Sequence, residues 1–296
     1  MHFTKKTVAE KRSNLISKLQ SKKLLRFPGA YNPLCAKLIA EIGFDGVYVS
    51  GGVMSNDLGL PDIGLTSLDQ VSYRSGQIAR VTDLPTIVDI DTGFGNCKKT
   101  IEVFEAKGLA GCHLEDQVAE KRCGHLDNKE LISLEEMVKK IEECVKSRKD
   151  KNFLIIARTD TCRELGLEEA ISRINLAAEV GADMGLLFPR TNEEAVEAVH
   201  QSKIPLVYVQ SRGNRDNRPL FSRNELEDMG YAMCIDAQVM LLASFDAQRR
   251  MLGELKETGD FSLLSQENNI QIRQEIEDII NLEEYYNIEK STVEKE

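Results

Sequence analysis

The sequence predicts an α/β protein built as a (β/α)8 TIM-type barrel, and three observations support this fold class. From residue 24 onward, short apolar runs alternate with longer amphipathic stretches, and the chain of 296 residues holds eight such units. Several amphipathic stretches end at a glycine just before the next run, as helices often do; examples are Gly43, Gly108 and Gly181. No Gly-x-Gly-x-x-Gly motif follows the first run, so a dinucleotide-binding open sheet has no support.

The apolar runs have the length and composition of buried parallel strands, and the stretches between them are typical of helices. The helical pattern is clearest over Pro33–Ala40 and Leu167–Val180. A doubly wound open sheet would also alternate, but the count of eight units favours the barrel. The predicted strands cover Leu24–Ala30, Gly46–Ser50, Thr86–Asp91, Gly111–Glu115, Phe153–Thr159, Met184–Pro189, Pro205–Val209 and Ala232–Ile235.

Helical segments precede and follow the predicted barrel of residues 24–256, and we expect one domain over residues 1–296. Residues 1–23 are charged throughout and lack the apolar core of a signal peptide, so they predict an amphipathic surface helix. A break at Gly259 and Ser262 precedes a helical tail, residues 264–296, with a predicted helix over Gln266–Tyr286. The tail has a larger apolar face than a monomeric barrel needs, which predicts a homo-oligomer.

Composition and charge limit the partners and the location that we expect. The net charge of −10 and the lack of a basic arm argue against a nucleic-acid partner. No apolar run reaches the length of about 18 residues that a membrane-spanning helix needs. The seven cysteines are odd in number and scattered, which favours reduced thiols in a cytoplasm over a disulfide framework or a zinc site.

Acidic residues at the end of the third predicted strand indicate a metal site. Asp89 and Asp91 are two positions apart, so both carboxylates should point to the same side of the strand. Paired negative charges on an inward face are costly unless a cation neutralises them, and carboxylate oxygens suit Mg²⁺ or Mn²⁺. Two solvated carboxylates beyond the strand end are the alternative. Glu115 and Asp116 end the next strand, where they are placed to hold metal-bound water or to orient an arginine.

Two other strand ends carry groups that suit a carboxylate ligand. The backbone amides of Ser50, Gly51 and Gly52 could form an anion-binding nest, although a plain strand-to-loop turn explains the same residues. Arg158 ends the fifth strand among acidic strand ends, where it can balance charge and clamp a substrate carboxylate. His113 lies within an apolar run and is predicted to be a buried structural histidine.

The segment Lys121-Arg122-Cys123-Gly124-His125 follows the fourth strand and must lie on a loop. Nearby cations favour a thiolate, so Cys123 is predicted to have a lowered pKa and to alkylate first among the cysteines. Gly124 allows close approach of the backbone to a ligand, and His125 is a candidate ligand-binding residue. The alternative is a solvated basic loop with an incidental cysteine.

Six motifs between residues 48 and 160 resemble, in order and spacing, the isocitrate lyase/phosphoenolpyruvate mutase superfamily. They are YVSGG, GLPDIG, VDIDTGFG, HLEDQ, KRCGH and ARTD, and KRCGH looks most like the 2-methylisocitrate lyase branch. The resemblance implies a barrel of that kind, with C-terminal helices exchanged between the subunits of a tetramer. It also implies cleavage of a carbon–carbon bond in a di- or tricarboxylate with Mg²⁺ or Mn²⁺.

The resemblance further implies roles for individual residues. Cys123 would protonate the leaving fragment, with Tyr48 and Arg158 completing the catalytic set. The implied metal residues are Asp89 and Asp91, with Asp62 and Glu115 supporting the water shell. The implied substrate-binding residues are Ser50, Gly51, Gly52, Gly124, His125, Arg158 and Arg273.

The second half of the chain departs from the resembled branch on the side that recognises the leaving fragment. Arg190 stands where a glutamate is usual, and Leu242 stands where a substrate-recognising arginine is usual. Further departures fall at Gln210-Ser211-Arg212 and Asp236-Ala237. Either new arginines rebuild a carboxylate pocket or the substrate differs; the candidate arginines are Arg190, Arg212, Arg215 and Arg218.

Three functions fit these observations. The first is a metal-dependent lyase that cleaves 2-methylisocitrate to pyruvate and succinate. The second is a relative that acts on another 2-hydroxy or 2-keto acid, such as a substituted malate, or oxaloacetate by decarboxylation. The third is a catalytically silent binding protein that kept the scaffold, although Cys123, the paired aspartates and Arg158 weigh against it.

Overall fold

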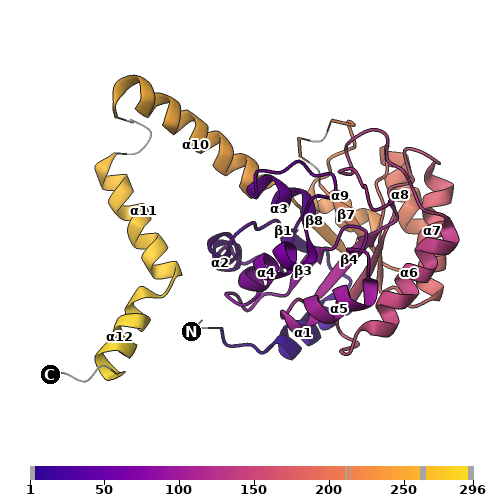
Figure 1. The fold of residues 1–296 in the computed structure, drawn as a ribbon, viewed down its shortest axis with the longest axis horizontal. Coiled ribbons are helices and arrows are strands. Elements are labelled where there is room, and N and C mark those ends of the chain that lie inside the picture. Colours follow the sequence, from indigo (N-terminus) through magenta and orange to yellow (C-terminus); the bar gives the residue numbers. More distant parts are fainter. Residues whose placement is uncertain (1–3, 211, 214, 261–264, 293–296) are drawn as a thin grey trace.

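Eight parallel strands lie side by side in the order β1-β8-β7-β6-β5-β4-β3-β2 in the computed structural model, which describes residues 4–210, 212–213, 215–260 and 265–292. The two end strands β1 and β2 meet through a bridge between Gly29 and Tyr48, so the sheet is a nearly closed barrel (Figure 1). The strands are β1 (Leu25–Pro28), β2 (Val47–Val49), β3 (Thr86–Asp89), β4 (Gly111–Glu115), β5 (Leu154–Arg158), β6 (Met184–Leu186), β7 (Leu206–Val209) and β8 (Met233–Asp236).

The predicted fold class and all eight predicted strands are confirmed, with ends that differ by a few residues. The largest consequence is at β3, which ends at Asp89 rather than at Asp91. Asp91 has a φ of 47° and lies in the turn after the strand. The prediction that both carboxylates share one side of a strand is therefore wrong. The turn after β3 brings them together instead.

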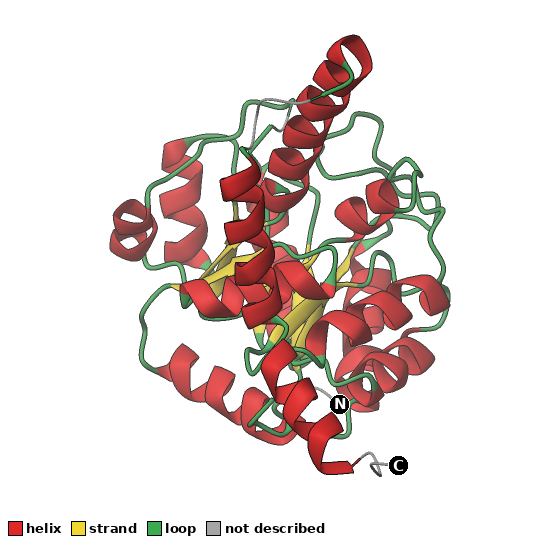
Figure 2. Cartoon of the chain, turned by 90° about the vertical axis from the view of Figure 1, so that its left-hand side faces the viewer, coloured by secondary structure: helices red, strands yellow, loops and turns green. Residues whose placement is uncertain are grey.

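Helices surround the barrel and connect successive strands, so each crossover returns the chain to the same end of the sheet (Figure 2). Many begin with a side-chain cap: Ser133, for example, accepts a hydrogen bond from the Glu136 backbone in a capping box. The barrel helices are α2 (Pro33–Ile42), α3 (Gly51–Asp57), α4 (Leu68–Ala79), α5 (Cys97–Ala106), α6 (Leu134–Ser147), α7 (Leu167–Glu179), α8 (Asn192–Gln201) and α9 (Arg223–Met229).

The N-terminal helix α1 (Val8–Gln20) is more than the surface helix that the sequence predicts. Leu15 is fully buried and packs with residues of the barrel interior, including Leu25 and Leu154. Arg12 is also buried, and its guanidinium donates to the backbone oxygens of Leu109 and Glu105. The helix thus closes the end of the barrel where the strands begin, and burial of Leu15 alone contributes roughly 2 kcal/mol.

Three C-terminal helices form an arm that leaves the barrel (Figure 1). They are α10 (Val239–Thr258), α11 (Gln266–Ile279) and α12 (Leu282–Thr292), and none of them has a buried residue. Gly259 ends α10 with a φ of 77°, as predicted, whereas Ser262 lies outside the described residues. The single helix predicted over Gln266–Tyr286 is wrong, because the chain breaks at Asn281, which has a φ of 63°.

Candidate active site

Side chains from the carboxyl ends of the strands surround a cavity of about 60 Å³. This is the end of a (β/α)8 barrel at which active sites are found. One half of the wall comes from β2 to β5 and is polar, and the other half comes from β6 to β8 and is largely apolar. The lining residues are Tyr48, Ser50, Gly52, Asp62, Asp89, His113, Cys123, Gly124, His125, Arg158, Leu186, Phe188, Val209, Arg218, Ala237 and Gln238.

Asp89 lies at the centre of the polar half. Its carboxylate accepts hydrogen bonds from the backbone amides of Asp91 at 3.0 Å and Gly51 at 3.2 Å. It also lies 3.6 Å from both a guanidinium nitrogen of Arg158 and Nδ1 of His113. Burial opposes ionisation, but the positive charge around Asp89 lowers its pKa, so this carboxyl is ionised at neutral pH.

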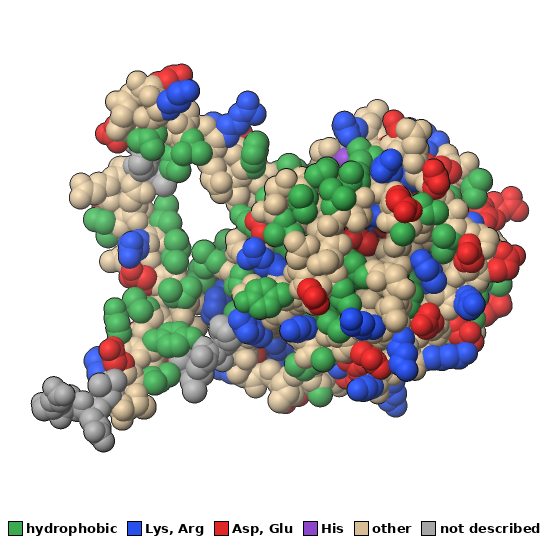
Figure 3. Space-filling model, viewed as in Figure 1, with side chains coloured by type: hydrophobic (Ala, Val, Ile, Leu, Met, Phe, Trp, Pro, Cys, Tyr) green, Lys and Arg blue, Asp and Glu red, His purple; other side chains and the backbone are tan. Residues whose placement is uncertain are grey.

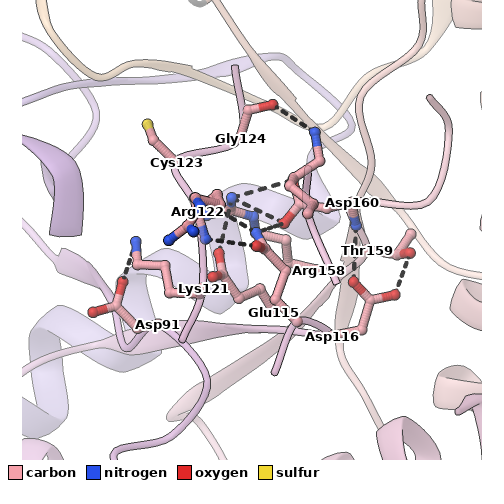
Figure 4. Close-up of polar contacts among 12 residues, drawn as sticks. Asp91, Glu115, Asp116, Lys121, Arg122, Cys123, Gly124, Arg158, Thr159 and Asp160 are labelled. Carbon is pink, nitrogen blue, oxygen red and sulfur yellow. Dashed lines mark hydrogen bonds and ion pairs between the residues drawn. The ribbon is translucent and has the colours of Figure 1, made fainter. Parts of the chain in front are cut away.

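A lysine that the sequence reasoning did not assign joins two further carboxylates. The ammonium of Lys121 is almost fully buried and pairs with Asp62 and, at 2.7 Å, with Asp91. Figure 4 shows the pair with Asp91. Burial opposes its charge, yet the surrounding carboxylates raise the pKa of Lys121 well above its ordinary value. Lys121 therefore acts as a fixed positive charge beside these two carboxylates.

Glycines allow these carboxylates to converge. A Cβ added to Gly51 would lie 2.8 Å from Asp91 Oδ1 and 3.1 Å from Asp89 Oδ2. A Cβ on Gly52 would lie 2.8 Å from Asp62 Oδ2. Any side chain at either position would displace an acidic group. Because the Gly51 amide donates to Asp89, it is already engaged, and the anion-binding nest predicted for it is not formed here.

The cations of this cluster do not give every carboxylate oxygen a hydrogen bond. Oδ1 of Asp91 and Oε2 of Glu115 lie 2.7 Å and 2.8 Å from nitrogens of Lys121 and Arg158 without hydrogen-bond geometry, and Oε1 of Glu115 is buried with no hydrogen-bond donor. Burial raises the pKa of Asp91 to about 6, and it raises the pKa of Glu115 well above the ordinary value. The cluster thus holds more acidic oxygen than its own cations and donors satisfy.

Glu115 and Asp116, adjacent in the sequence, orient different arginines. Glu115 lies 2.8 Å from the guanidinium of Arg158, which also lies 3.1 Å from Asp160. Asp116 points away from that group, accepting hydrogen bonds from Thr159 and from the Asp160 amide at 2.9 Å (Figure 4). Its other partner is Arg173 of α7 at 3.0 Å. Asp116 therefore stabilises the packing of the segment after β5 and α7 around the site, whereas Glu115 belongs to the site itself.

Tyr48 and His113 form a buried pair beside Asp89. The Tyr48 hydroxyl lies 2.7 Å from Nε2 of His113, and the two rings stack with their centroids 5.7 Å apart. Burial lowers the pKa of His113 to about 4 and raises that of Tyr48 well above its ordinary value. Both groups are therefore neutral at neutral pH. His113 is buried as predicted, but it also lines the cavity, which the sequence reasoning missed.

Cys123 lines the cavity, but its predicted low pKa is wrong. Burial raises the pKa of this thiol to about 12, and the charge of Asp62 adds to the effect. Lys121 and Arg158 oppose the shift without reversing it. Since its acidic neighbours neutralise these cations, the thiol sees little net positive charge and remains protonated. His125 Nδ1 lies 3.9 Å from the sulfur.

Polar contacts hold the loop of residues 117–130 over the cavity. Gln117 donates to the Arg122 backbone oxygen and to Asp160, and its own oxygen accepts from the Arg122 amide at 2.8 Å. Lys129 donates to the Gly124 carbonyl at 3.1 Å. A Cβ on Gly124 would lie 3.1 Å from the Arg158 guanidinium, a tight contact that glycine avoids. Gln117 and Lys129 were not assigned from the sequence; Asp160, the side-chain partner of Gln117, is 43 positions away along the chain.

The structure separates the candidate arginines. Arg218 lines the cavity with its side chain only 7% exposed. Arg190 is exposed and outside the lining, and Arg212 pairs with Asp236 at the surface. Arg273 lies on α11 with 81% of its side chain exposed, paired with a glutamate of its own helix. Within one chain, therefore, neither Arg190 nor Arg273 reaches the cavity.

Comparisons to known proteins agree with the fold. Residues 16–256 match the family described as phosphoenolpyruvate phosphomutase, and the chain belongs to this phosphoenolpyruvate mutase/isocitrate lyase group. A solved structure of oxaloacetate acetylhydrolase with 3,3-difluorooxalacetate has a TM-score of 0.87 and 30% identity, covering 97% of this chain and 98% of that one. A structure of 2,3-dimethylmalate lyase has the same TM-score at 28% identity, covering 97% and 95%.

Sequence relatives narrow the comparison to carbon–carbon lyases. A protein of Corynebacterium glutamicum named probable 2-methylisocitrate lyase 2 is 44% identical over 257 residues, covering 84% of this chain and 82% of the relative. The 2-methylisocitrate lyase of Aeropyrum pernix is 37% identical over 81% of this chain and 78% of its own. The 2,3-dimethylmalate lyase of Eubacterium barkeri is also 37% identical, over 73% of this chain and 76% of its own.

Proposed function

We propose that this protein is a metal-dependent carbon–carbon lyase that cleaves 2-methylisocitrate to pyruvate and succinate. The observation that carries the proposal is a protonated thiol, Cys123, lining the same cavity as Asp89 and Arg158. Such a lyase needs a proton donor at one end of the broken bond and charge stabilisation at the other. The identity to 2-methylisocitrate lyases over most of the chain supports this substrate.

The acidic cluster fits a divalent cation, which we assign to Asp89 and Asp91 with Asp62 and Glu115 supporting its water shell. The buried Glu115 oxygen without a donor, the glycines that admit three carboxylates and the all-oxygen donor set support this assignment. Among the described residues, no group of three or more His, Cys, Asp or Glu side chains is arranged to hold a metal by itself. Waters and substrate would complete the shell, as is common for Mg²⁺ or Mn²⁺. When bound, the cation supplies Lewis-acid polarisation of the oxygen that becomes a ketone.

The side chains of this protein divide the remaining work. Arg158, oriented by Glu115 and Asp160, binds the carboxylate of the forming keto acid, with Ser50 and Gly52 beside it. As the hydroxyl passes its proton to a carboxylate of the acidic cluster and becomes a carbonyl, the electron pair of the broken carbon–carbon bond stays on the leaving fragment. Cys123 Sγ then donates its proton to that carbon. A thiol with a pKa near 12 is present in the required protonated form at neutral pH.

The substrate must displace part of the wall to enter. A cavity of about 60 Å³ is much smaller than ligand sites, which are usually several hundred Å³. The loop that carries Cys123, Gly124 and His125 covers the cavity, and we assign its opening to substrate entry.

A second candidate is cleavage of a substituted malate such as 2,3-dimethylmalate. The observation in its favour is the apolar wall of Leu186, Phe188, Val209 and Ala237, which suits methyl groups. Similarity to 2,3-dimethylmalate lyases supports it as well.

The deciding experiment is a turnover assay with magnesium and each substrate in turn. Release of pyruvate measures the turnover. The proposed function predicts pyruvate and succinate from 2-methylisocitrate, with the larger kcat/KM for this substrate. Higher kcat/KM for 2,3-dimethylmalate would establish the second candidate. No pyruvate from either would contradict both and leave oxaloacetate as the next substrate to assay.

We also infer that the protein is a homo-oligomer, a tetramer, in which the arm α10–α12 is exchanged between subunits. Because α10 leaves the barrel, the outer faces of β8 and β1 are left with a groove of about 410 Å³ that includes Leu24, Phe44 and Met240. Hydrophobic side chains gather along the arm in Figure 3. They include Leu242, Phe245, Leu252, Leu255, Ile270, Ile272, Ile276 and Ile280, each at least 38% exposed. A second copy of this arm matches that groove in chemistry, and it would also carry Arg273 toward a neighbouring site.

Light scattering tests this assembly. The intact chain should be oligomeric at micromolar concentration, and a Phe245→Asp, Leu252→Asp double variant should be smaller, because two charges cannot be buried in an apolar groove. A monomeric intact chain would contradict the exchange. We further propose a cytoplasmic location; within the described residues, no helix has the length and hydropathy to cross a membrane.

A further inference from the structure

We propose that Arg218 binds the distal carboxylate of the substrate, which is the one farther from the cleaved bond of the two that leave on the fragment protonated by Cys123. Arg218 thereby selects substrates that have this carboxylate over those with an apolar group in its place. This inference rests on the proposed lyase function and deepens it. The residue lies in the segment between β7 and α9, where the chain departs from the resembled branch.

The strand order places Arg218 across the cavity from the acidic cluster. β3, which carries Asp89, and β7 are four strands apart in either direction around the eight-stranded barrel. Arg218 and Val209, the last residue of β7, both line the cavity. A substrate whose hydroxyl-bearing end lies at Asp89 and Arg158 therefore extends its other end toward the β7 wall.

The Arg218 side chain is held in place rather than spread over the surface. Its guanidinium stacks on the Phe188 ring, 4.4 Å from the ring centre, and its Nε pairs with Asp216 at 2.9 Å. Arg158 lies over the same ring at 5.1 Å. An arginine that is already ordered loses little conformational freedom on binding a ligand, and its planar fork matches a carboxylate.

Charge around the cavity points to the same role. The two arginines that line it, among the residues that the structure describes, are Arg158 and Arg218. Arg158 is engaged by the acidic network of Asp89, Glu115 and Asp160 on the β3–β5 side. Arg218 contacts Phe188 and lines the cavity together with Val209 and Ala237, where a carboxylate would otherwise meet apolar carbon.

The other candidates for this task lie elsewhere. Two of them, Arg190 and Arg215, are exposed and do not line the cavity. The side chain of Arg212 is about half exposed and pairs with Asp236. Leu242, at the position where the resemblance expects an arginine, is 45% exposed on α10. Arg218 is thus the new arginine that the fold brings to the cavity.

The test compares two ligands that differ only at the distal group. Succinate has a carboxylate where butanoate has a methyl group, and calorimetry with magnesium present measures the dissociation constant of each without requiring turnover. Wild type should prefer succinate, and Arg218→Leu should reduce this preference by about 10- to 100-fold, the worth of a charge-assisted hydrogen bond. Arg218→Lys, which keeps the charge but loses the fork, should reduce it several-fold.

Arg80→Leu is the matched control, because Arg80 is exposed at the end of α4 and lies outside the cavity lining. It should leave the preference unchanged. The inference is overturned if wild type binds both ligands equally, or if the Lys variant, or the Leu variant with native circular dichroism, keeps the wild-type ratio. An equal loss of affinity for both ligands in the Leu variant would also overturn it, since that result indicates a structural role for Arg218. Failure of the proposed function is seen separately, as absence of pyruvate release by wild type.

Discussion

The two halves of the cavity wall differ in how much their residues depend on one another. On the β2–β5 side, Asp89, Arg158 and Glu115 touch one another or share partners within 3.6 Å. On the β6–β8 side, Leu186, Val209 and Ala237 contribute mainly shape. Reaction chemistry therefore belongs to the connected polar half, and substrate choice belongs to the apolar half with its single buried arginine. This comparison predicts large losses from changes in the first half and small ones in the second.

The largest effect is expected at Asp89. Asp89→Asn keeps the shape but removes the ionised carboxylate that four neighbouring groups surround, so turnover should fall about 10⁴-fold or to background at any magnesium concentration. Asp228→Asn, at an exposed position of α9, is the control. Excess chelator should have the same effect on wild type. Full turnover in chelator would show that the acidic half needs no divalent cation.

Cys123 comes next. Cys123→Ser should fold normally and lose about 10²–10³-fold in kcat while KM changes little, because the proton donor is altered and the carboxylate contacts remain. Cys234→Ser, at the other half-buried thiol, should keep wild-type turnover. Wild-type kcat in the Cys123 variant would remove this residue from the mechanism.

The structure also changes the expected reactivity of this thiol. With its pKa raised to about 12, Cys123 is almost entirely protonated below about pH 9. Iodoacetamide should therefore modify it slowly at pH 7, and the rate should rise with pH well above the range of an ordinary thiol. Mass spectrometry of the modified peptide measures this, and rapid alkylation at pH 7 would restore the low pKa that the sequence suggests.

A stability effect is expected at Lys121. Lys121→Met removes the charge between Asp62 and Asp91 and leaves buried carboxylates without their cation, so the free energy of unfolding without metal should drop by about 3 kcal/mol. Added magnesium should recover more stability in this variant than in wild type, because it supplies the missing positive charge. Lys99→Met, exposed on α5, is the control in thermal unfolding. Equal stability of variant and wild type without metal would show that the Lys121 pair is not important for folding.

The smallest effect is expected in the apolar half. Phe188→Leu should lower kcat/KM less than about 10-fold, since it removes a ring contact worth about 1 kcal/mol and keeps a hydrophobic side chain. The ratio of kcat/KM values for 2-methylisocitrate and 2,3-dimethylmalate should change more than kcat does. A loss as large as that of Asp89→Asn would mean that the two halves do not divide chemistry from selectivity.

Local patterns in the sequence were enough to predict the barrel and most of the polar half. Strand ends such as Asp89, Glu115 and Arg158 are found by their position after apolar runs, because parallel strands bring their carboxyl ends together. Lys121 and Gln117 could not be assigned in this way. Each acts on residues many positions away, Asp62 and Asp160 respectively, and only the folded loop brings them into contact.

The sequence by itself determined the alternation of strands and helices, the glycines at helix ends and the residue types at the strand ends, because these depend on short-range geometry. The tertiary structure decided the ionisation of Cys123, since burial and the charge of Asp62 outweigh the cations nearby. It also decided that Arg218 lines the cavity while Arg190 and Arg273 do not. Burial, the electrostatic field and the distances between side chains all depend on residues remote in the chain. They are set only when the barrel has folded.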